Sequence, residues 1–370
     1  MKIVYQIFMV VATLMLTILL VSGIRGDFAS AGPYLVVFFF AVGIAIRIID
    51  GLKGYTYTFL IFAAVALSMY YPSCFDKIGD FKLSALITPC IQLIMFGMGT
   101  SMSTKDFAGV LKEPKGVFIG VVSHFMIMPL MGFLLATSSG LSDEIAAGII
   151  LIGCSPNGMA SNVISYLAKA NLALSITITA VSTMLAPLVT PLLMKLLAGA
   201  LVHIDTLDMM WDIFKMVIIP IGAGLLFNKL LKGRATWIIE KVMPKISMFG
   251  IMLIIVIITS AGRESLLSIG GKLLLIVLAH NLFGYFFGYW TGRLFRMNER
   301  DCRTMAIEVG MQNGGLASGI AKEMGKMATV GLAPAIFGPL MNITGSILAS
   351  WWHKKPIEDV SGYHHNERSK

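Results

Sequence analysis

One carboxylate, Glu308, stands inside a long apolar segment, where an uncompensated charge is expensive. At the centre of a bilayer, estimates for a charged side chain begin at about 2.5–3.5 kcal/mol. Gln312 follows Glu308 by one helical turn, so the two side chains would share a face. We predict that a bound cation compensates the carboxylate. A structural ion pair or a protonated carboxylic acid is the alternative.

A second set of oxygen-bearing side chains lies earlier in the chain. Ser161 and Asn162 follow a glycine-containing segment, and Ser175 and Thr179 are four residues apart, which places both hydroxyls on one helix face. Carboxylate, amide, hydroxyl and carbonyl oxygens are the ligands that hard cations prefer. No His or Cys spacing in the sequence suits a transition metal. We therefore predict that this set holds a hard cation.

Both sets adjoin interruptions that a continuous membrane helix avoids. Residues 153–162 place Pro156 between two glycines, and residues 308–315 contain three glycines. Proline removes a backbone donor and clashes with the preceding turn. Freed backbone groups are tolerated at membrane depth only inside protein or beside water. The two interruptions therefore predict broken helices that face an internal cavity.

The half-helix after each interruption would direct its N-terminus, with free amides and partial positive charge, into this cavity. Such an arrangement favours the anionic group of a small organic substrate. We assign substrate contacts to Asn157, Gly158 and Met159 in the first interruption, to Asn313 in the second and to Asn342 in the last apolar segment. For Asn342, a hydrogen bond between helices is the alternative.

The elements that position these residues are predicted to be membrane helices. Of the 370 residues, 13% are charged and 56% hydrophobic, and the mean hydropathy is +0.82. Soluble domains average about a quarter charged residues, so this composition excludes a soluble protein. About 20 apolar residues span a bilayer. Twelve such segments are present: 3–24, 28–46, 54–75, 83–104, 116–142, 145–168, 170–194, 209–231, 246–262, 273–292, 301–321 and 327–353.

The net charge of +9 comes from short basic clusters between the apolar segments, a pattern typical of cytoplasmic loops rather than of a nucleic-acid-binding surface. With the N-terminus inside, 20 Lys and Arg residues fall on the cytoplasmic side and 8 on the other. We predict an integral protein of a bacterial inner membrane with both termini in the cytoplasm. The first segment is longer than a signal-peptide core of about 7–15 residues, which favours an uncleaved helix.

The last ten segments divide into two sets of five, at about 54–200 and 209–353, and the interrupted segment is the fourth of each set. Because five is an odd number, the second set enters the membrane from the opposite side. The sequence therefore predicts an inverted repeat, and interrupted segments at matching positions indicate a transporter binding site.

At these residues the chain resembles the bile acid:sodium symporter family. The resemblance covers residues 54–352 and rests on four blocks: MFGMG at 95–99, GCSPNGMASN at 153–162 with the following Ser175 and Thr179, EVGMQN at 308–313 and NITGS at 342–346. It implies an all-α polytopic membrane protein with a ten-helix inverted repeat (5+5), in which two broken helices cross in a core domain beside a panel domain. The panel would comprise 54–105 and 209–262, and the core 115–200 and 270–353. Residues 1–50 would add two N-terminal helices, which bring the count to twelve, and 354–370 a cytoplasmic tail.

The resemblance also implies one or two sodium ions, no organic cofactor, and a set of ion ligands. One sodium site would comprise Ser161, Asn162, Ser175, Thr179 and Glu308. A second would comprise Glu308 again, the carbonyls of Val309 and Met311, and Gln312. Where the family often contributes a Gln from the fifth segment, this chain has His124, which we include in the set. A histidine hydrogen-bonded in a helix interface is the alternative for His124. The chain also departs from the family at Asn157, where Gly is common, and at Met341, where His is frequent.

These features predict a sodium-coupled symporter of a small organic anion, such as a bile-acid-like or other carboxylate, that works by alternating access in a lipid bilayer. A proton-coupled carrier, with Glu308 and His124 as the relay, is one alternative. The arsenite-efflux type usually has a Cys after the Pro of the first interruption, where this chain has Asn157. A non-transporting membrane sensor or an intramembrane enzyme is a further alternative, but no Asp stands beside His124 or His280 to form a hydrolytic triad. The sequence leaves the oligomeric state open.

Overall fold

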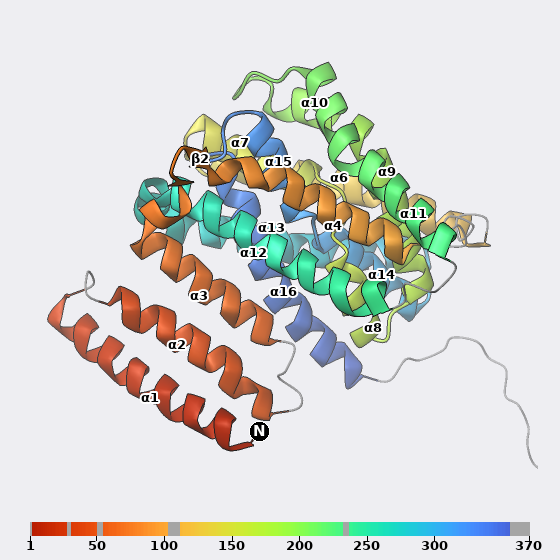
Figure 1. Cartoon of the computed structure of the whole chain (residues 1–370). Coiled ribbons are helices and arrows are strands. Elements are labelled where there is room, and N and C mark those ends of the chain that lie inside the picture. Colours follow the sequence, from red (N-terminus) through yellow and green to blue (C-terminus); the bar gives the residue numbers. More distant parts are fainter. Residues whose placement is uncertain (1, 28–30, 50–54, 103–111, 232–236, 356–370) are drawn as a thin grey trace, which may run out of the picture.

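The computed structural model describes residues 2–27, 31–49, 55–102, 112–231 and 237–355, and most of them are helical (Figure 1). The predicted segment ends at 28, 54 and 104, and the tail beyond Lys355, lie outside the described residues.

The first part of the chain runs from the N-terminus to the end of the first predicted set of helices. Its elements are α1 (Lys2–Arg25), α2 (Gly32–Ala45), η1 (Ile46–Ile48), α3 (Thr56–Tyr70), η3 (Pro72–Phe75), β1 (Lys77–Ile78), β2 (Phe81–Lys82), η4 (Leu83–Leu86), α4 (Ile87–Ser101), α6 (Pro114–Ser138), α7 (Asp143–Cys154), α8 (Ala160–Leu167) and α9 (Leu172–Ala198). The two short strands form an antiparallel hairpin that the sequence did not predict.

The second part contains the elements that correspond to the other five predicted segments. They are α10 (Thr206–Ile213), the π-helical η5 (Phe214–Ile218), α11 (Ile219–Leu231), the π-helical η6 (Ile238–Val242), α12 (Met243–Ala261), α13 (Arg263–Leu294), α14 (Glu299–Gly310), α15 (Gly314–Glu323) and α16 (Leu332–His353). Helix α13 begins at Arg263 rather than at the predicted residue 273, because a helix continues through polar residues such as Glu264 and Lys272 that end an apolar run.

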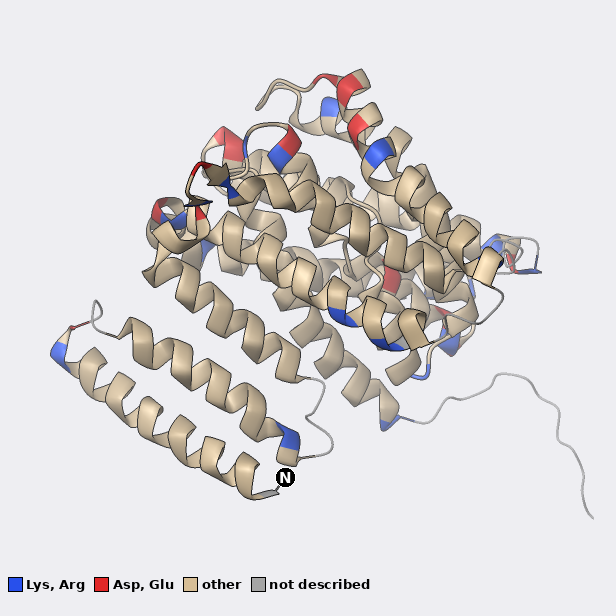
Figure 2. Ribbon diagram, viewed as in Figure 1, with Lys and Arg blue, Asp and Glu red and all other residues tan. Residues whose placement is uncertain are grey.

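Among the described residues, eight helical stretches are long and apolar enough to cross a bilayer. Two shorter apolar helices, Gly32–Ile48 and Thr56–Tyr70, accompany them. Charged residues gather mainly at the two ends of the helices and leave the middle apolar (Figure 2). The architecture is that of an all-α polytopic membrane protein.

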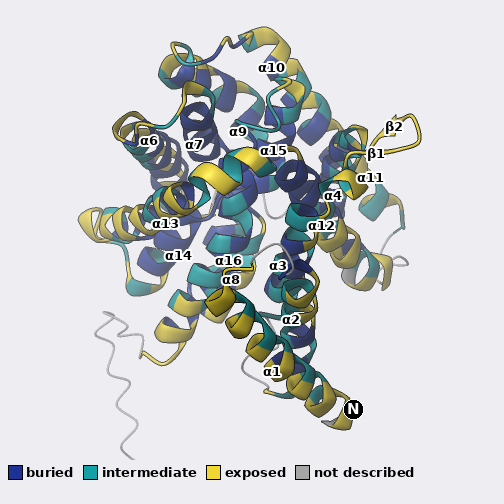
Figure 3. Cartoon of the chain, turned by 90° about the vertical axis from the view of Figure 1, so that its left-hand side faces the viewer, coloured by how far each residue is buried: buried dark blue, intermediate teal, exposed yellow. Residues whose placement is uncertain are grey.

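The helices pack in two groups. In one, α4 lies against α11 and α12, and α12 lies against α3. In the other, α6, α7, α9, α13, α14 and α16 surround the interior, with α8 between α9 and α16. The most deeply buried residues lie in α7 and α14 of this second group and in α15, which packs against α16 (Figure 3). Helices α7 and α14, which end at the predicted site, are therefore both well shielded.

A stripe of glycines on α13 brings that helix into close contact with α14. A Cβ atom at Gly284 would lie 2.7 Å from the Cα of Gly310, and one at Gly288 would lie 2.6 Å from the carbonyl oxygen of Met305. Small residues permit such backbone approach in membrane helix pairs. The stripe holds the end of α14 in a fixed position against α13.

The two N-terminal helices, α1 and α2, attach to the first helix group through α3. Helix α1 packs on α2, and α2 on α3, so that the three form a row (Figure 1). Aromatic rings join the row, with 6.2 Å between the centroids of Phe8 and Phe40 and 5.5 Å between those of Phe39 and Phe62. The remaining surface of α1 is largely exposed (Figure 3) and apolar, as expected for a face that meets lipid.

Candidate ion and substrate site

The two interruptions predicted from the sequence are present and touch one another. The first separates α7 from α8, and the second separates α14 from α15. An isolated antiparallel bridge pairs Asn157 with Gln312. The amide of Gly158 donates to the carbonyl of Met311 at 3.2 Å, and the amide of Asn313 donates to that of Pro156 at 2.8 Å. Each interruption thus satisfies backbone groups that the other leaves free.

Gly158 is required where the two backbones cross. A Cβ atom at this position would lie 2.6 Å from the carbonyl oxygen of Gln312, closer than Cβ atoms come to other atoms in proteins. Any larger residue would push the interruptions apart. The close approach explains why a glycine follows Asn157 here.

Oxygen atoms from three elements meet beside this crossing. The hydroxyl of Ser175 on α9 lies 2.5 Å from Oε1 of Glu308, and that of Thr179 lies 2.9 Å from Oε2. Asn162 on α8 places its Oδ1 2.9 Å from Ser175 and 3.4 Å from Thr179. Ser161 lies 3.3 Å from Thr179. All five residues predicted for the first sodium site are therefore brought together.

This cluster suits a hard cation. Ser161, Ser175 and Glu308 have no exposed surface, and Thr179 is 1% exposed. Ser175 approaches two acceptors but has one hydrogen to donate, and the same holds for Thr179. The hydrogen bonds to the Glu308 carboxylate come from hydroxyls, and within the described residues no ion pair reaches it. A buried carboxylate surrounded by neutral oxygens has the composition of a sodium site.

The residues predicted for the second sodium site lie around the last turn of α14. Nε2 of Gln312 donates to the carbonyl of Val309 at 2.9 Å, and the carbonyl of Met311 accepts from Gly158. His124 on α6 places Nε2 2.9 Å from the carbonyl of Ser155 and Nδ1 3.2 Å from that of Glu308. Both ring nitrogens of His124 therefore face protein atoms.

A cavity of about 350 Å³ lies between the two helix groups, against the crossing. Four of the five residues predicted to contact substrate line it, namely Gly158, Met159, Asn313 and Asn342. The described residues that line it carry no charged side chain, and most are apolar. The N-termini of α8 and α15 adjoin the cavity and supply partial positive charge.

Asn157, the fifth residue predicted to contact substrate, is not among the residues that line this cavity. Its side chain has no exposed surface, and its Nδ2 donates to the carbonyl of Glu308 and lies 3.1 Å from Nδ1 of His124. The side chains of the other two asparagines are engaged as well. Asn313 accepts from the amide of Leu316 at 3.0 Å and so caps α15, and Asn342 donates to the carbonyl of Gly338 within its own helix at 3.0 Å.

Two supporting residues were missed by the sequence reasoning. Asn281 on α13 donates to the carbonyl of Gly310, the last residue of α14, at 2.9 Å, and accepts from Thr344 at 2.6 Å. Thr190 on α9 donates to the carbonyl of Cys154, the last residue of α7, at 2.8 Å. Each satisfies a free carbonyl at an interrupted end. A polar residue in the middle of an apolar segment was the available signal for Asn281.

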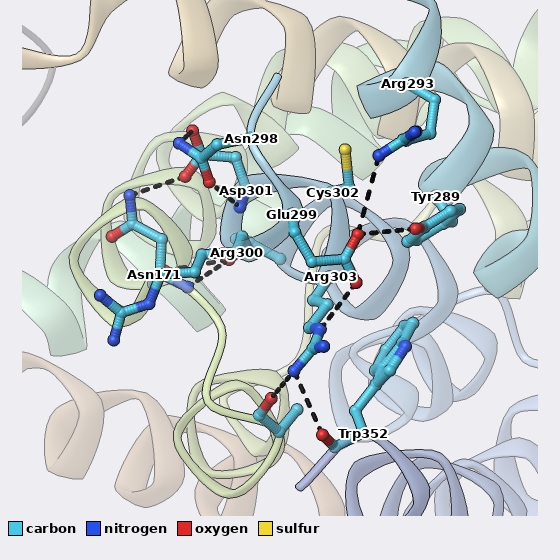
Figure 4. A network of polar contacts seen from close by, with 12 residues as sticks. Asn171, Tyr289, Arg293, Asn298, Glu299, Arg300, Asp301, Cys302, Arg303 and Trp352 are labelled. Atoms are coloured by element: carbon cyan, nitrogen blue, oxygen red, sulfur yellow. Dashed lines mark hydrogen bonds and ion pairs between the residues drawn. The ribbon is translucent and has the colours of Figure 1, made fainter. Parts of the chain in front are cut away.

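A second buried charge, Arg303, lies on the same helix as Glu308. Its side chain is 1% exposed, and its Nε lies 2.9 Å from Oε1 of Glu299. Its Nη1 donates to the carbonyls of Ala168 and Trp352 at 3.1 and 3.2 Å. Tyr289 donates to the other carboxylate oxygen of Glu299 at 2.7 Å (Figure 4). Arg303 thus joins the ends of α8 and α16 to the start of α14.

The chain is similar to known transporters over most of its length. Residues 88–269 match the model of the Sodium Bile acid symporter family. An uncharacterized sodium-dependent transporter, YocS, of Bacillus subtilis is 38% identical over 86% of this chain and 97% of its own length. The probable sodium/metabolite cotransporter BASS1 of Arabidopsis thaliana is 32% identical over 73% of this chain and 68% of its own length. These relatives are named as transporters, in agreement with the prediction of a carrier rather than an enzyme. The chain belongs to the sodium bile acid symporter family.

Proposed function

We propose that the protein carries a small organic anion, bile-acid-like or another carboxylate, across the membrane together with sodium, by alternating access. The observation that supports this most is the setting of Glu308. Its carboxylate is fully buried and accepts hydrogen bonds from Ser175 and Thr179, which belong to the opposite half of the chain. A sodium ion among these oxygens would neutralise the charge and join the two halves.

Electrostatics favours a cation at this position. In a medium of low dielectric constant, an unpaired buried carboxylate is strongly destabilising. Hydroxyl hydrogen bonds offset only part of that cost, because each contributes about 1.5–3 kcal/mol to a charged acceptor. A monovalent cation in direct contact with the carboxylate supplies the missing charge. The printed names of the relatives, sodium-dependent transporter and sodium/metabolite cotransporter, agree with sodium.

The substrate would occupy the cavity at the crossing. Its anionic group would face the N-termini of α8 and α15, and its apolar part would lie against the side chains of α3, α4 and α12. Coupling would follow from the chain connection between the two sites. Gln312 and Asn313 border the cavity, and they follow closely after the turn of α14 that holds Glu308. Sodium that orders this segment would prepare the cavity for the anion.

The two helix groups supply bodies that could move against one another. We assign α3, α4, α11 and α12 to the panel, with α1 and α2 attached through α3, and the group around α14 to the core. The ten helices from α3 onward would form the inverted repeat, with α7–α8 and α14–α15 each counted as one broken helix, for twelve crossings in all. Both termini would be cytoplasmic in a bacterial inner membrane. Rocking of core against panel would expose the cavity to each side in turn.

Uptake by the purified protein in proteoliposomes tests this function. Carboxylates from a panel of different sizes should accumulate under an inward sodium gradient and not under an inward potassium gradient. Equal uptake in both gradients would contradict sodium coupling. Uptake that follows an imposed pH gradient in the absence of sodium would instead support the proton-coupled alternative.

A further inference from the structure

A groove lies between α13 and α16, away from the crossing of the broken helices. Its volume is about 700 Å³, within the range of about 300–1,000 Å³ that is usual for ligand sites. None of the described residues that line it also lines the cavity at the crossing. Half of its lining residues are aromatic, namely Tyr285, Phe286, Tyr289, Trp290, Trp351 and Trp352.

The walls of this α13–α16 groove face outward. Phe286 and Trp290 on α13 and Ile347 on α16 are each more than half exposed. In a membrane protein, an exposed apolar surface meets lipid chains, which are as apolar as a leucine side chain. The groove is therefore open to the lipid that surrounds the helices.

The hydroxyl groups in the groove are already bonded to the protein. Tyr285 donates to a backbone carbonyl of α16 at 3.2 Å, and Thr344 donates to Oδ1 of Asn281 at 2.6 Å. Tyr289 donates to Glu299 at 2.7 Å. The walls thus offer mainly apolar contact, which suits a hydrocarbon chain better than a polar molecule.

One end of the groove carries basic side chains. Lys355 lines the groove two residues after α16, and its Nζ lies 3.6 Å from the centroid of the Trp351 ring. Arg293 belongs to the last turn of α13, and its side chain is 53% exposed. Both residues lie at helix ends that we predict to be cytoplasmic.

The carboxylate of Glu299, which also lines the groove, does not cancel this charge. Its Oε1 lies 2.9 Å from Nε of Arg303. Its Oε2 accepts from Tyr289 and lies 3.9 Å from Nη1 of Arg293 (Figure 4). In the described part of the chain, no carboxylate lies within ion-pair distance of Lys355. Since Arg303 balances Glu299, this end of the groove keeps an excess of positive charge.

We infer that the α13–α16 groove binds an anionic phospholipid, with an acyl chain along its walls and the phosphate at Lys355 and Arg293. An apolar groove with a basic end matches a molecule that is hydrocarbon at one end and anionic at the other. Basic pockets between membrane helices on the cytoplasmic side are typical sites for acidic headgroups. Trp and Tyr side chains at the same end suit the boundary between membrane and water. The inference goes beyond the proposed function and does not depend on sodium coupling.

A lipid in the groove would contact residues that hold the start of α14. Glu299 and Trp352 line the groove, and both also contact Arg303. The bound lipid should therefore attach α14 more firmly to α13 and α16.

Native mass spectrometry of the full-length protein tests the inference with two probes, phosphatidylglycerol and phosphatidylcholine with the same acyl chains. The wild type should retain phosphatidylglycerol preferentially. Lys355→Gln should lower that preference by about fivefold, the factor expected from one basic side chain beside an acidic headgroup, and Lys355→Arg should keep it. Equal retention of both lipids by the wild type, or an unchanged preference in Lys355→Gln, would overturn the inference.

The matched control is Lys354→Gln, an exposed neighbour that does not line the groove. It should retain phosphatidylglycerol as the wild type does. An equal loss in Lys354→Gln and Lys355→Gln would show that general positive charge attracts the lipid, and the inference would be wrong.

A variant that fills the groove tests the place of the acyl chain. Ile347→Trp should reduce retention of both lipids, whereas Leu192→Trp, at an exposed position on α9 outside the groove, should not. Equal effects of the two variants would contradict binding in the groove. If Ile347→Trp instead converts a dimer into a monomer and leaves lipid retention unchanged, the groove is an interface between copies of the chain and the inference is wrong.

Tryptophan fluorescence in phosphatidylcholine vesicles gives an independent measurement, because three of the five tryptophans line the groove. A small share of phosphatidylglycerol with brominated chains should quench the wild type more than the same share of brominated phosphatidylcholine. This difference should disappear in Lys355→Gln. Equal quenching of the wild type by the two lipids would contradict the inference. Neither measurement needs sodium or substrate, so its outcome is separate from that of the proposed function.

Discussion

Arg303 and Glu308 lie on the same helix, α14, and both are almost completely buried, yet their surroundings differ. Arg303 has a carboxylate partner in Glu299 and donates to two backbone carbonyls, those of Ala168 and Trp352. Figure 4 shows its contacts with Glu299 and Trp352. Glu308 receives hydrogen bonds from hydroxyls alone, and the described residues place no basic side chain in ion-pair contact with it.

We expect this difference to separate a structural charge from a functional one. The charge of Arg303 is balanced by groups that belong to the protein, so its balance needs no bound ion. On the proposed function, the charge of Glu308 would be balanced by a bound sodium ion, so its balance would depend on whether that ion is present. Buried charges that lack a fixed partner mark ion pathways in membrane proteins.

Glu308→Gln should have the largest effect, because it removes the charge and keeps the shape. Loss of a buried charged partner costs about 3–5 kcal/mol, which corresponds to a loss of sodium affinity of about 100-fold or more. Sodium-driven uptake in proteoliposomes should disappear, as it should for Glu308→Ala. Unfolding in sodium-free buffer should meanwhile require a higher temperature than for the wild type. A variant with normal uptake would remove Glu308 from the site.

Arg303→Met should show the opposite pattern. It leaves Glu299 without its nearest partner and frees the carbonyls of Ala168 and Trp352, so the free energy of unfolding should fall by about 3 kcal/mol. The loss should be equal with and without sodium, and the sodium concentration for half-maximal stabilisation should not change. Arg300→Met, at an exposed position on the same helix, serves as the control with little loss. A changed sodium affinity in Arg303→Met would contradict the distinction between Arg303 as a structural charge and Glu308 as an ion ligand.

Ser175→Ala and Thr179→Val should each weaken sodium binding by about tenfold, because each removes a hydroxyl from a charged carboxylate, a contribution of about 1.5–3 kcal/mol. The control is Thr183→Val, one turn further along α9, whose buried hydroxyl donates to the carbonyl of Thr179 at 2.7 Å and does not reach Glu308. Titration of sodium against thermal stability measures all three. Equal effects at Thr179 and Thr183 would contradict the proposed ligand set.

Gly338→Ala should have the smallest effect and should affect the substrate rather than the ion. Gly338 lines the cavity, and a Cβ atom there would meet no atom within 4 Å. The added methyl group should raise the KM for a carboxylate that fills the cavity by about fivefold and leave the sodium requirement unchanged. Gly222→Ala, which is also in open space but outside the cavity lining, is the matched control. An altered sodium requirement in Gly338→Ala would contradict the separation of the two sites.

The sequence was most informative where physical constraints are strict. A lone carboxylate in an apolar segment, hydroxyls four residues apart and glycine-rich interruptions led to Glu308, Ser175, Thr179 and both broken helices. These features can be recognised in the sequence because an unpaired polar group inside a membrane is energetically costly, so each one that occurs needs a reason. The surroundings of His124 were harder to predict, because only the structure brings its ring and the side chain of Asn157 together.

Other features were outside the reach of the sequence because they depend on tertiary packing. Asn281 and Thr190 hold the broken ends of α14 and α7, but each is a single polar residue in an apolar segment, a pattern shared with many side chains that bond to their own helix. The early start of α13 at Arg263 was missed because helix formation does not require an apolar sequence. Arg303 was counted among the cytoplasmic charges, and nothing in the sequence indicated that it is buried.

Equilibrium binding of radiolabelled sodium to the purified, substrate-free protein tests most directly whether an ion balances Glu308. The wild type should bind sodium with saturation, and excess potassium should not displace it. Glu308→Gln should bind none over the same range, while Arg303→Met should bind as much per folded molecule as the wild type. Saturable sodium binding that survives in Glu308→Gln would contradict the account.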